Sequence, residues 1–520
     1  MLTRKKIFLI TLTTAIAVRA FFAWIFSSSM FKHFHLVRGL DMETLLRFSE
    51  WGSGGDAIPL FTPHRLLLFV NWFCHGKTHE VMPVFIVQTL LGAIACAALA
   101  DLVLSLTGKR RGALTAGIIA ALYLPSLVYE FSILQDSFTT NFTLLAIWGT
   151  VYAWRKRFQP FPAALCAILW APALCGRPTA VLCAALFALW SIIRMYRKKL
   201  WRRLIFPAIL LLTLLAAVSL FNSHHGWKFS PFYSPMQYAK TFNTADGTAS
   251  ATEYQVAKNA LIRSPQLLSA YERRENQNIY FWQRQLPELR VLPAPSELIP
   301  AACAALVILL LAGAWKRRSF YFVAIPLLTL ALPLCFREVI GRYRLMLTPY
   351  FIVAVVMAFY ALKKLPRLHM ILVLLCGGLA AAGSIYSAVG KPTVIAEDFH
   401  AWAMAAKNSG TEKKVVYDLY YRYWQQTDFT AEKAFCDFAE CTLEYHDPDM
   451  TLKVIRMNKS SNPDLAYYYY GMTKVMQNRP EEVAMIYSRI NPDRLPPRLR
   501  ANYFRICNDT RKILLHKRKN

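Results

Sequence analysis

The stretch IFLITLTTAIAVRAFFAWIF, residues 7–26, is an apolar run that contains a single charged residue, Arg19. A helix needs about 20 residues to cross the roughly 30 Å of hydrocarbon in a bilayer. An arginine in that setting is costly unless it faces a partner or water. The run therefore predicts a membrane-spanning helix inside a bundle, with Arg19 turned toward an acid or toward a substrate.

Similar apolar runs recur along the chain, which has 520 residues and is 55% hydrophobic. Because a backbone in lipid must satisfy its own polar groups, runs of this length predict helices. We predict an all-α polytopic membrane protein with about eleven transmembrane helices. The expected spans are 7–27, 82–106, 112–130, 138–154, 160–175, 179–194, 204–222, 297–315, 319–335, 345–362 and 368–390.

The net charge of +29 could suggest nucleic-acid binding, but the basic residues are not gathered on one soluble segment. They occupy alternate loops between the apolar runs, which is the positive-inside pattern. We therefore exclude nucleic acid as a partner. The pattern predicts a cytoplasmic N-terminus, an outer (periplasmic) C-terminus and an inner-membrane location. The basic clusters are 4–6, 109–111, 155–157, 194–203, 316–318 and 363–367.

The same topology leaves three long segments on the outer side: 28–81, 223–296 and the C-terminal region. We predict a membrane domain over 1–391 and a soluble helical domain over 392–520. The stretch from Asp464 to Pro496 resembles one tetratricopeptide (TPR) hairpin. Tyr467, Tyr470 and Gly471 would lie in its first helix, and Val483 and Tyr487 in its second.

Acids and arginines gather on the predicted outer side. Asp41 and Glu43 follow the first span, and Asp136 precedes the fourth. Arg342 and Arg344 stand directly before a late span, against the positive-inside rule. A carboxylate can accept the proton of an attacking hydroxyl. The paired N–H donors of an arginine guanidinium can bind two oxygens of a phosphate. The pattern is typical of glycosyl transfer at a membrane surface, although a loop acid or a salt-bridge cluster is the simpler alternative.

The order of these features resembles the GT-C superfamily of integral-membrane glycosyltransferases, over about residues 7–365. Within that superfamily, the sequence most resembles the branch of protein O-mannosyltransferases, aminoarabinose transferases and their bacterial relatives. The resemblance rests on Arg19 in the first span and on LDMETLLRFSEWGSGGDAIPLFTPHR from Leu40. It also rests on LQDSF from Leu134, GRPT from Gly176, FNTADG from Phe242 and GRYRLMLTP from Gly341. The family's second acid is more often glutamate than the aspartate found here.

The resemblance implies inverting transfer of a sugar from a polyprenyl-phosphate donor to a hydroxyl on a lipid, glycan or protein acceptor. It assigns catalysis to Asp41 and Asp136. The substrate-binding set that it implies is Arg342, Arg344, Arg65, Arg19, Glu43 and Asn243. No cofactor or metal ligand set is expected, and a divalent ion bridging an acid to the donor phosphate stays open. Membrane lipids are the remaining expected partners.

Three other classes stay open. An O-antigen ligase or polymerase would share the lipid-linked donor but would depend on one dominant late outer loop. A transporter or flippase would need polar residues at mid-membrane depth, for which Asp101 and Arg19 are the candidates. A structural membrane protein with an interaction tail would need neither feature.

Overall fold

The computed structural model describes residues 3–37, 40–43, 46, 81–176, 179–224, 264–273, 277–336 and 341–519. Its chain divides into two compact units. The first comprises Met1–Ser28 and Gly39–Lys391, and the second Ser29–Arg38 and Pro392–Asn520. Within the described ranges every regular element is a helix, and none is a strand. The all-helical class predicted from the apolar runs is confirmed.

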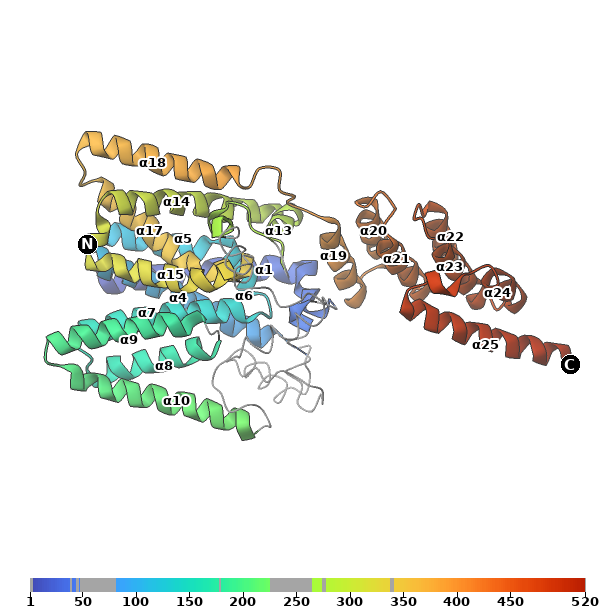
Figure 1. Ribbon diagram of the computed structural model, residues 1–520, viewed down its shortest axis with the longest axis horizontal. Helices are drawn as coiled ribbons and strands as arrows, with labels where there is room; N and C mark the ends of the chain where they lie inside the picture. Colours follow the sequence, from blue (N-terminus) through green and yellow to red (C-terminus); the bar gives the residue numbers. More distant parts are fainter. Residues whose placement is uncertain are drawn as a thin grey trace. The chain divides into compact units, whose positions relative to one another are not determined.

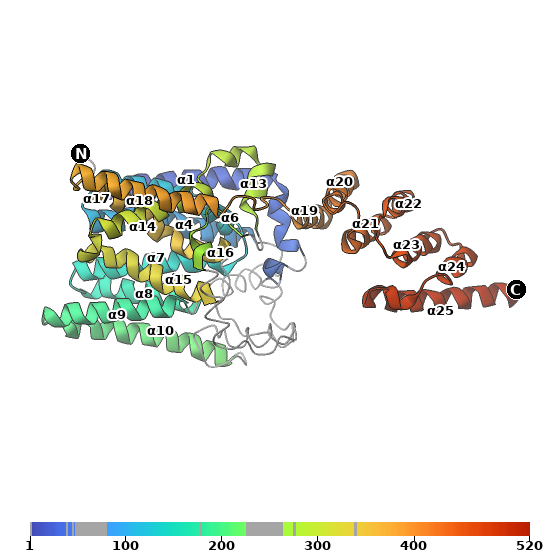
Figure 2. The same cartoon turned by 45° about the horizontal axis from the view of Figure 1, so that its top comes forward.

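The first unit is a bundle whose long helices run side by side (Figures 1 and 2). Several short helices cap the bundle at one end, among them α13 (Ile279–Gln285) and α16 (Gly341–Arg344). The longer helices are α1 (Arg4–Ser28), α4 (Met82–Thr107), α5 (Arg110–Leu122), α6 (Leu124–Glu130), α7 (Gln135–Arg155), α8 (Pro160–Gly176), α9 (Thr179–Arg197), α10 (Ile205–His224), α14 (Pro295–Leu311), α15 (Tyr321–Phe336), α17 (Thr348–Leu362) and α18 (Arg367–Tyr386).

Each of the eleven expected spans overlaps one of these helices, but fewer are long and apolar enough to cross a membrane. Among the described residues seven helices meet that test, namely α1, α4, α9, α10, α14, α17 and α18 with their short flanking turns. An eighth span exists if α5 and α6, bent by 51° relative to each other, are counted as one. The predicted number of eleven spans is therefore not confirmed. Helix α8 and the apolar part of α15 are short, and α7 opens with polar residues.

The basic clusters that the sequence places in alternate loops meet at one end of the bundle. Arg4 forms an ion pair with Asp101, and Arg155 donates to Ser105 Oγ at 2.9 Å. Arg203 donates to the carbonyl of Arg157 at 3.2 Å. The α9–α10 and α17–α18 turns lie at the same end as the N-terminus (Figure 1). One end of the bundle is thus strongly basic, and the side of the membrane that it faces stays a prediction.

A buried ion pair joins the C-terminal half of α1 to the last residue of α6. Arg19 donates from Nε and Nη2 to the two carboxylate oxygens of Glu130, at 2.7 and 2.6 Å. The side chains are 4% and 2% exposed. Gly92 of α4 makes room for them, because a Cβ there would lie 2.0 Å from Glu130 Oε1. The sequence predicts that Arg19 faces either an acid or a substrate, and the structure shows that it faces an acid, Glu130.

Removing one member of this pair should destabilise the bundle. In Arg19→Met the Glu130 carboxylate stays buried without a cation, so we expect the unfolding free energy to fall by about 3–5 kcal/mol. The double variant Arg19→Met/Glu130→Met removes both charges and should recover most of the loss. Thermal unfolding in lipid nanodiscs measures both effects, and a double variant as unstable as the single one would contradict this account.

The second unit is a row of helical hairpins followed by one long helix (Figure 2). The short 3-10 helix η1 (Met30–Leu36) belongs to this unit, and its Phe31 ring stacks on Trp402 at a centroid distance of 5.3 Å. The sequence analysis had treated that segment only as part of an outer loop. The helices are α19 (Ala396–Asn408), α20 (Lys413–Gln425), α21 (Glu432–Glu444), α22 (Pro448–Met457), α23 (Pro463–Met476), α24 (Pro480–Tyr487) and α25 (Pro497–Lys519).

The α23–α24 hairpin lies where the sequence predicts one. Tyr467 lies in the first helix as expected; Tyr468 and Tyr469 are buried, whereas Tyr467 is 37% exposed. Gly471 of α23 lies directly against Tyr487 of α24, since a Cβ on Gly471 would lie 1.9 Å from Tyr487 Cε1. The turn of the helix, rather than the residue type, decides which of the four adjacent tyrosines face inward.

Gly471→Ala should therefore loosen this hairpin. The added methyl group must displace the Tyr487 ring, and such overpacking costs about 1–3 kcal/mol. Hydrogen exchange measured by mass spectrometry should show faster exchange in α23 and α24. Gly383→Ala in α18 is the control, because its methyl would meet nothing within 4 Å. Unchanged protection in the Gly471 variant would show that the close approach is not needed.

Candidate functional site

The end of the bundle opposite the basic loops joins an acid and an arginine that are far apart in the sequence. Arg342 Nη1 donates to Asp41 Oδ2 at 2.5 Å. Asp41 stands in a helical turn after α1, and Arg342 lies in the four-residue helix α16. The Asp41 side chain is 41% exposed and that of Arg342 10%. The pair therefore presents an open carboxylate beside a largely enclosed cation.

The position of Arg342 is set by its own helix turn. Its Nη2 donates to Tyr343 Oη at 3.2 Å, and its guanidinium lies over the Tyr343 ring at 4.9 Å. The N–H of Gly341 donates to the carbonyl of Arg273 at 2.8 Å, which ties α16 to the loop before α13. These contacts hold the guanidinium beside Asp41 with part of its donor set in use.

Arg344 points elsewhere, into the loop 264–273. Its Nη1 donates to the carbonyl of Ser269 at 2.6 Å, and its Nη2 lies 3.7 Å from Glu272 Oε2. Both side chains are about 5% exposed or less. Burial raises the pKa of the Glu272 carboxyl above its usual range, and the nearby Arg344 cation opposes that shift. Arg344 thus anchors the loop, and the neighbouring arginines have different environments.

A glutamine that no sequence pattern marks ties together three segments at this end of the bundle. Gln277 Nε2 donates to Ser132 Oγ at 3.1 Å and contacts Met42 Sδ at 3.8 Å. Its Oε1 accepts from the indole N–H of Trp282 at 2.9 Å. Gln277 is 3% exposed. Because Met42 directly follows Asp41, this hub helps to hold the turn that carries the carboxylate. No sequence motif marks such a residue.

The other predicted site residues fall into two groups. Asp136 lies fully buried in the first turn of α7, where a negative charge suits the helix dipole, and Glu43 is half-buried two residues after Asp41. Arg65 and Asn243 lie outside the described residues. Asp41 is therefore the more accessible of the two predicted catalytic acids.

An apolar cavity of about 200 Å³ lies among α7, α8, α9 and α10. Trp170, Phe187 and Leu211 are among its lining residues. The polar Thr150 at its wall is satisfied, because it accepts from the Trp170 indole at 2.9 Å and donates to the Ala146 carbonyl at 2.8 Å. A cavity of this kind suits a hydrocarbon chain.

Within the described ranges no group of three or more histidine, cysteine, aspartate or glutamate side chains is placed to hold a metal ion. Cys436 and Cys441 are free thiols on the same helix, α21.

Comparison with known proteins finds no counterpart. No family model matches the chain, no curated protein matches it, and no solved structure matches it. The resemblance to the GT-C superfamily therefore stays a prediction from the sequence features described above.

A double-mutant cycle tests the coupling of Asp41 and Arg342. We expect Asp41→Asn and Arg342→Gln to be non-additive by about 1 kcal/mol in unfolding free energy, because the two side chains are in direct contact. Asp41→Asn combined with Arg284→Gln is the matched control, since Arg284 is exposed in α13. Additive effects for the Arg342 cycle would contradict the ion pair.

Proposed function

We propose that this protein is a membrane glycosyltransferase that moves a sugar from a polyprenyl-phosphate donor to a hydroxyl acceptor. The observation that carries the proposal is the contact between Asp41 and Arg342. These are the residues to which the resemblance assigns the catalytic carboxylate and the donor-phosphate contact. They are 301 positions apart in the chain and lie together at one end of a membrane bundle.

In the proposed reaction the Asp41 carboxylate accepts the proton of the acceptor hydroxyl. The hydroxyl oxygen attacks the anomeric carbon from the face opposite the phosphate, and a new glycosidic bond forms with inversion. The bond from the anomeric carbon to the phosphate oxygen breaks, and polyprenyl phosphate leaves with the electron pair. Arg342 stabilises the charge that develops on that phosphate, as preorganised cations do. Asp136, being buried, would act by orienting its neighbours.

The structure's exposed fractions support this division of roles. Asp41 is open enough to meet a hydroxyl, whereas Arg342 is enclosed, and a guanidinium withdrawn from water interacts more strongly with a phosphate. Arg344 is occupied by Ser269 and Glu272, so we assign it to positioning the loop beside the site.

The apolar cavity among α7–α10 fits the lipid part of such a donor. Thr150 at its wall is 14 residues from Asp136 along α7, which corresponds to about 21 Å at 1.5 Å per residue. A polyprenyl chain is long enough to reach from the polar end of the bundle into this cavity.

A transporter is the second candidate, favoured by the 51° bend between α5 and α6. Broken helices of this kind surround the substrate sites of many transporters. The buried charges argue against it: Arg19 is paired with Glu130, and Asp101 with Arg4 and the Trp148 indole. An O-antigen ligase or polymerase would use the same donor class, and only the acceptor would distinguish it.

The second unit has the spacing of tetratricopeptide repeats. Its alternate helices α19, α21, α23 and α25 begin at residues 396, 432, 463 and 497, and the repeat length of that family is about 34 residues. We propose a TPR-like domain that serves recognition. We also propose that the polar end of the bundle and this domain face the outside of the inner membrane.

Sugar transfer by the purified protein in nanodiscs tests the proposal. A panel of radiolabelled polyprenyl-phosphate sugars is offered with a cell-envelope extract as the source of acceptors. We expect one donor to be consumed with release of polyprenyl phosphate, and Asp41→Asn to lower the rate by at least about 100-fold.

Glu288→Gln is the control, because Glu288 is an exposed acid in the turn before α14. Full activity in Asp41→Asn would remove the role assigned to that residue. Failure of the wild type to consume any donor would favour transport.

A further inference from the structure

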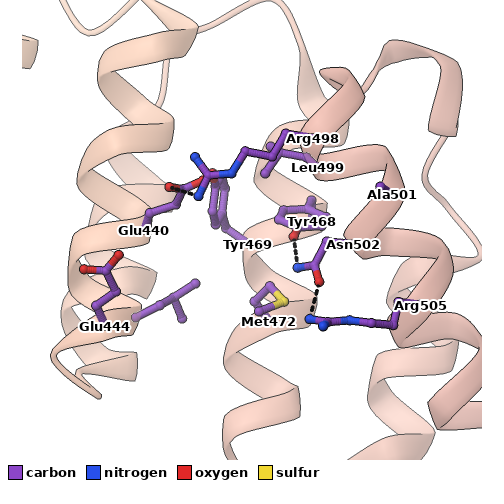
Figure 3. A pocket seen from close by; sticks show the side chains of 11 residues that line it. Glu440, Glu444, Tyr468, Tyr469, Met472, Arg498, Leu499, Ala501, Asn502 and Arg505 are labelled. Atoms are coloured by element: carbon purple, nitrogen blue, oxygen red, sulfur yellow. Dashed lines mark hydrogen bonds and ion pairs between the residues drawn. The ribbon is translucent and has the colours of Figure 1, made fainter. Parts of the chain in front are cut away.

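The second unit contains a groove between α21, α23 and α25, with a volume of about 540 Å³ (Figure 3). Its floor is aromatic and apolar, formed by Tyr468, Tyr469, Met472 and Leu499. Tyr468 and Tyr469 are almost fully buried, so the floor is part of the packed core and keeps its shape without a ligand. The groove lies entirely within this unit.

One wall of the groove is a polar stripe on α25. Arg498, Asn502 and Arg505 are spaced i, i+4 and i+7, which places their side chains on one face of the helix. Figure 3 shows the three side chains directed over the floor. Arg505 donates to Asn502 Oδ1 at 2.6 Å, and Asn502 donates to Tyr468 Oη at 2.6 Å. The stripe is therefore pre-ordered by its own hydrogen bonds.

The acids that line the groove are paired with cations, whereas its arginines keep donors available. Across from α25, Glu444 pairs with Lys407, and Glu440 pairs with Arg498 at 3.3 Å. Arg505 has only the neutral Asn502 as a partner within the described residues. Arg498 keeps most of its donors available, since its side chain is 84% exposed. Both arginines can thus accept a further anion, while both acids already have cations beside them.

From this arrangement we infer that the groove binds an extended peptide segment of a partner protein that carries two carboxylates three residues apart. Seven residues of helix separate Arg498 from Arg505, a distance of about 10.5 Å. Three residues of chain in the extended polyproline II conformation span about 9 Å, and because that conformation has three residues per turn, side chains i and i+3 lie on the same face. Each carboxylate can then meet one guanidinium fork, and an apolar side chain between them can lie on Tyr468 and Met472.

This inference is independent of the reaction at the membrane end. It assigns the second unit a partner of stated chemistry, an acidic peptide, and the glycosyltransferase proposal can fail without affecting it.

Fluorescence anisotropy with the full-length protein in zwitterionic nanodiscs tests the inference. The probe is a fluorescein-labelled peptide of about ten residues, built from glycine, serine and leucine with two glutamates three positions apart. The comparison peptide has glutamine at both positions. We expect the glutamate peptide to bind the wild type about tenfold more tightly.

Two variants place the binding in the groove. Arg505→Gln should reduce the preference for glutamate by several-fold, because one of the two guanidinium partners is lost. Arg511→Gln, which makes the same charge change at an exposed position of α25 outside the groove, should change affinity by less than about twofold. Ala501→Trp fills the exposed rim of the groove and should weaken binding without affecting the core.

Equal binding of the two peptides would overturn the inference, as would no binding of either. A loss in Arg511→Gln as large as that in Arg505→Gln would also overturn it, because diffuse attraction to the basic helix would then explain the binding.

Discussion

The ion pair between Arg19 and Glu130 is the constraint from which the rest of the bundle follows. A guanidinium inside a membrane helix must be neutralised, and here two hydrogen bonds of 2.6 and 2.7 Å do so. The pair fixes α1 against the end of α6, with Gly92 of α4 pressed against both side chains. One turn beyond Arg19, Phe22 of α1 packs on Phe131 and stacks on Trp282.

That packing continues into the polar end of the bundle. Trp282 donates to Gln277, and Gln277 contacts both Ser132 and Met42. Met42 follows Asp41, whose carboxylate accepts from Arg342. A chain of direct contacts therefore runs from a charge in the membrane to the candidate site. Of the two predicted catalytic acids, Asp41 is the one that is open to an incoming hydroxyl, since Asp136 is fully buried.

The sequence predicts the helices well because apolar run length is a strong signal, and it identifies Asp41 and Arg342 because acids and arginines stand out beside such runs. The number of spans is not confirmed, since among the described residues α7, α8 and α15 are more polar or shorter than the helices that are long and apolar enough to cross a membrane. Glu272 and Gln277 are not predicted from the sequence, because they lie in a long polar segment. Only their tertiary contacts distinguish them from the other polar residues there.

If a donor phosphate binds Arg342, it must compete with Asp41 for the same guanidinium. The most direct test is the affinity of polyprenyl phosphate, without a sugar, for the wild type and for Asp41→Asn in nanodiscs. The account predicts several-fold tighter binding by Asp41→Asn, because the arginine no longer has to give up an ion pair. Arg342→Gln should bind more weakly than the wild type. Equal or weaker binding by Asp41→Asn would contradict the account, since Arg342 would then not be the phosphate contact.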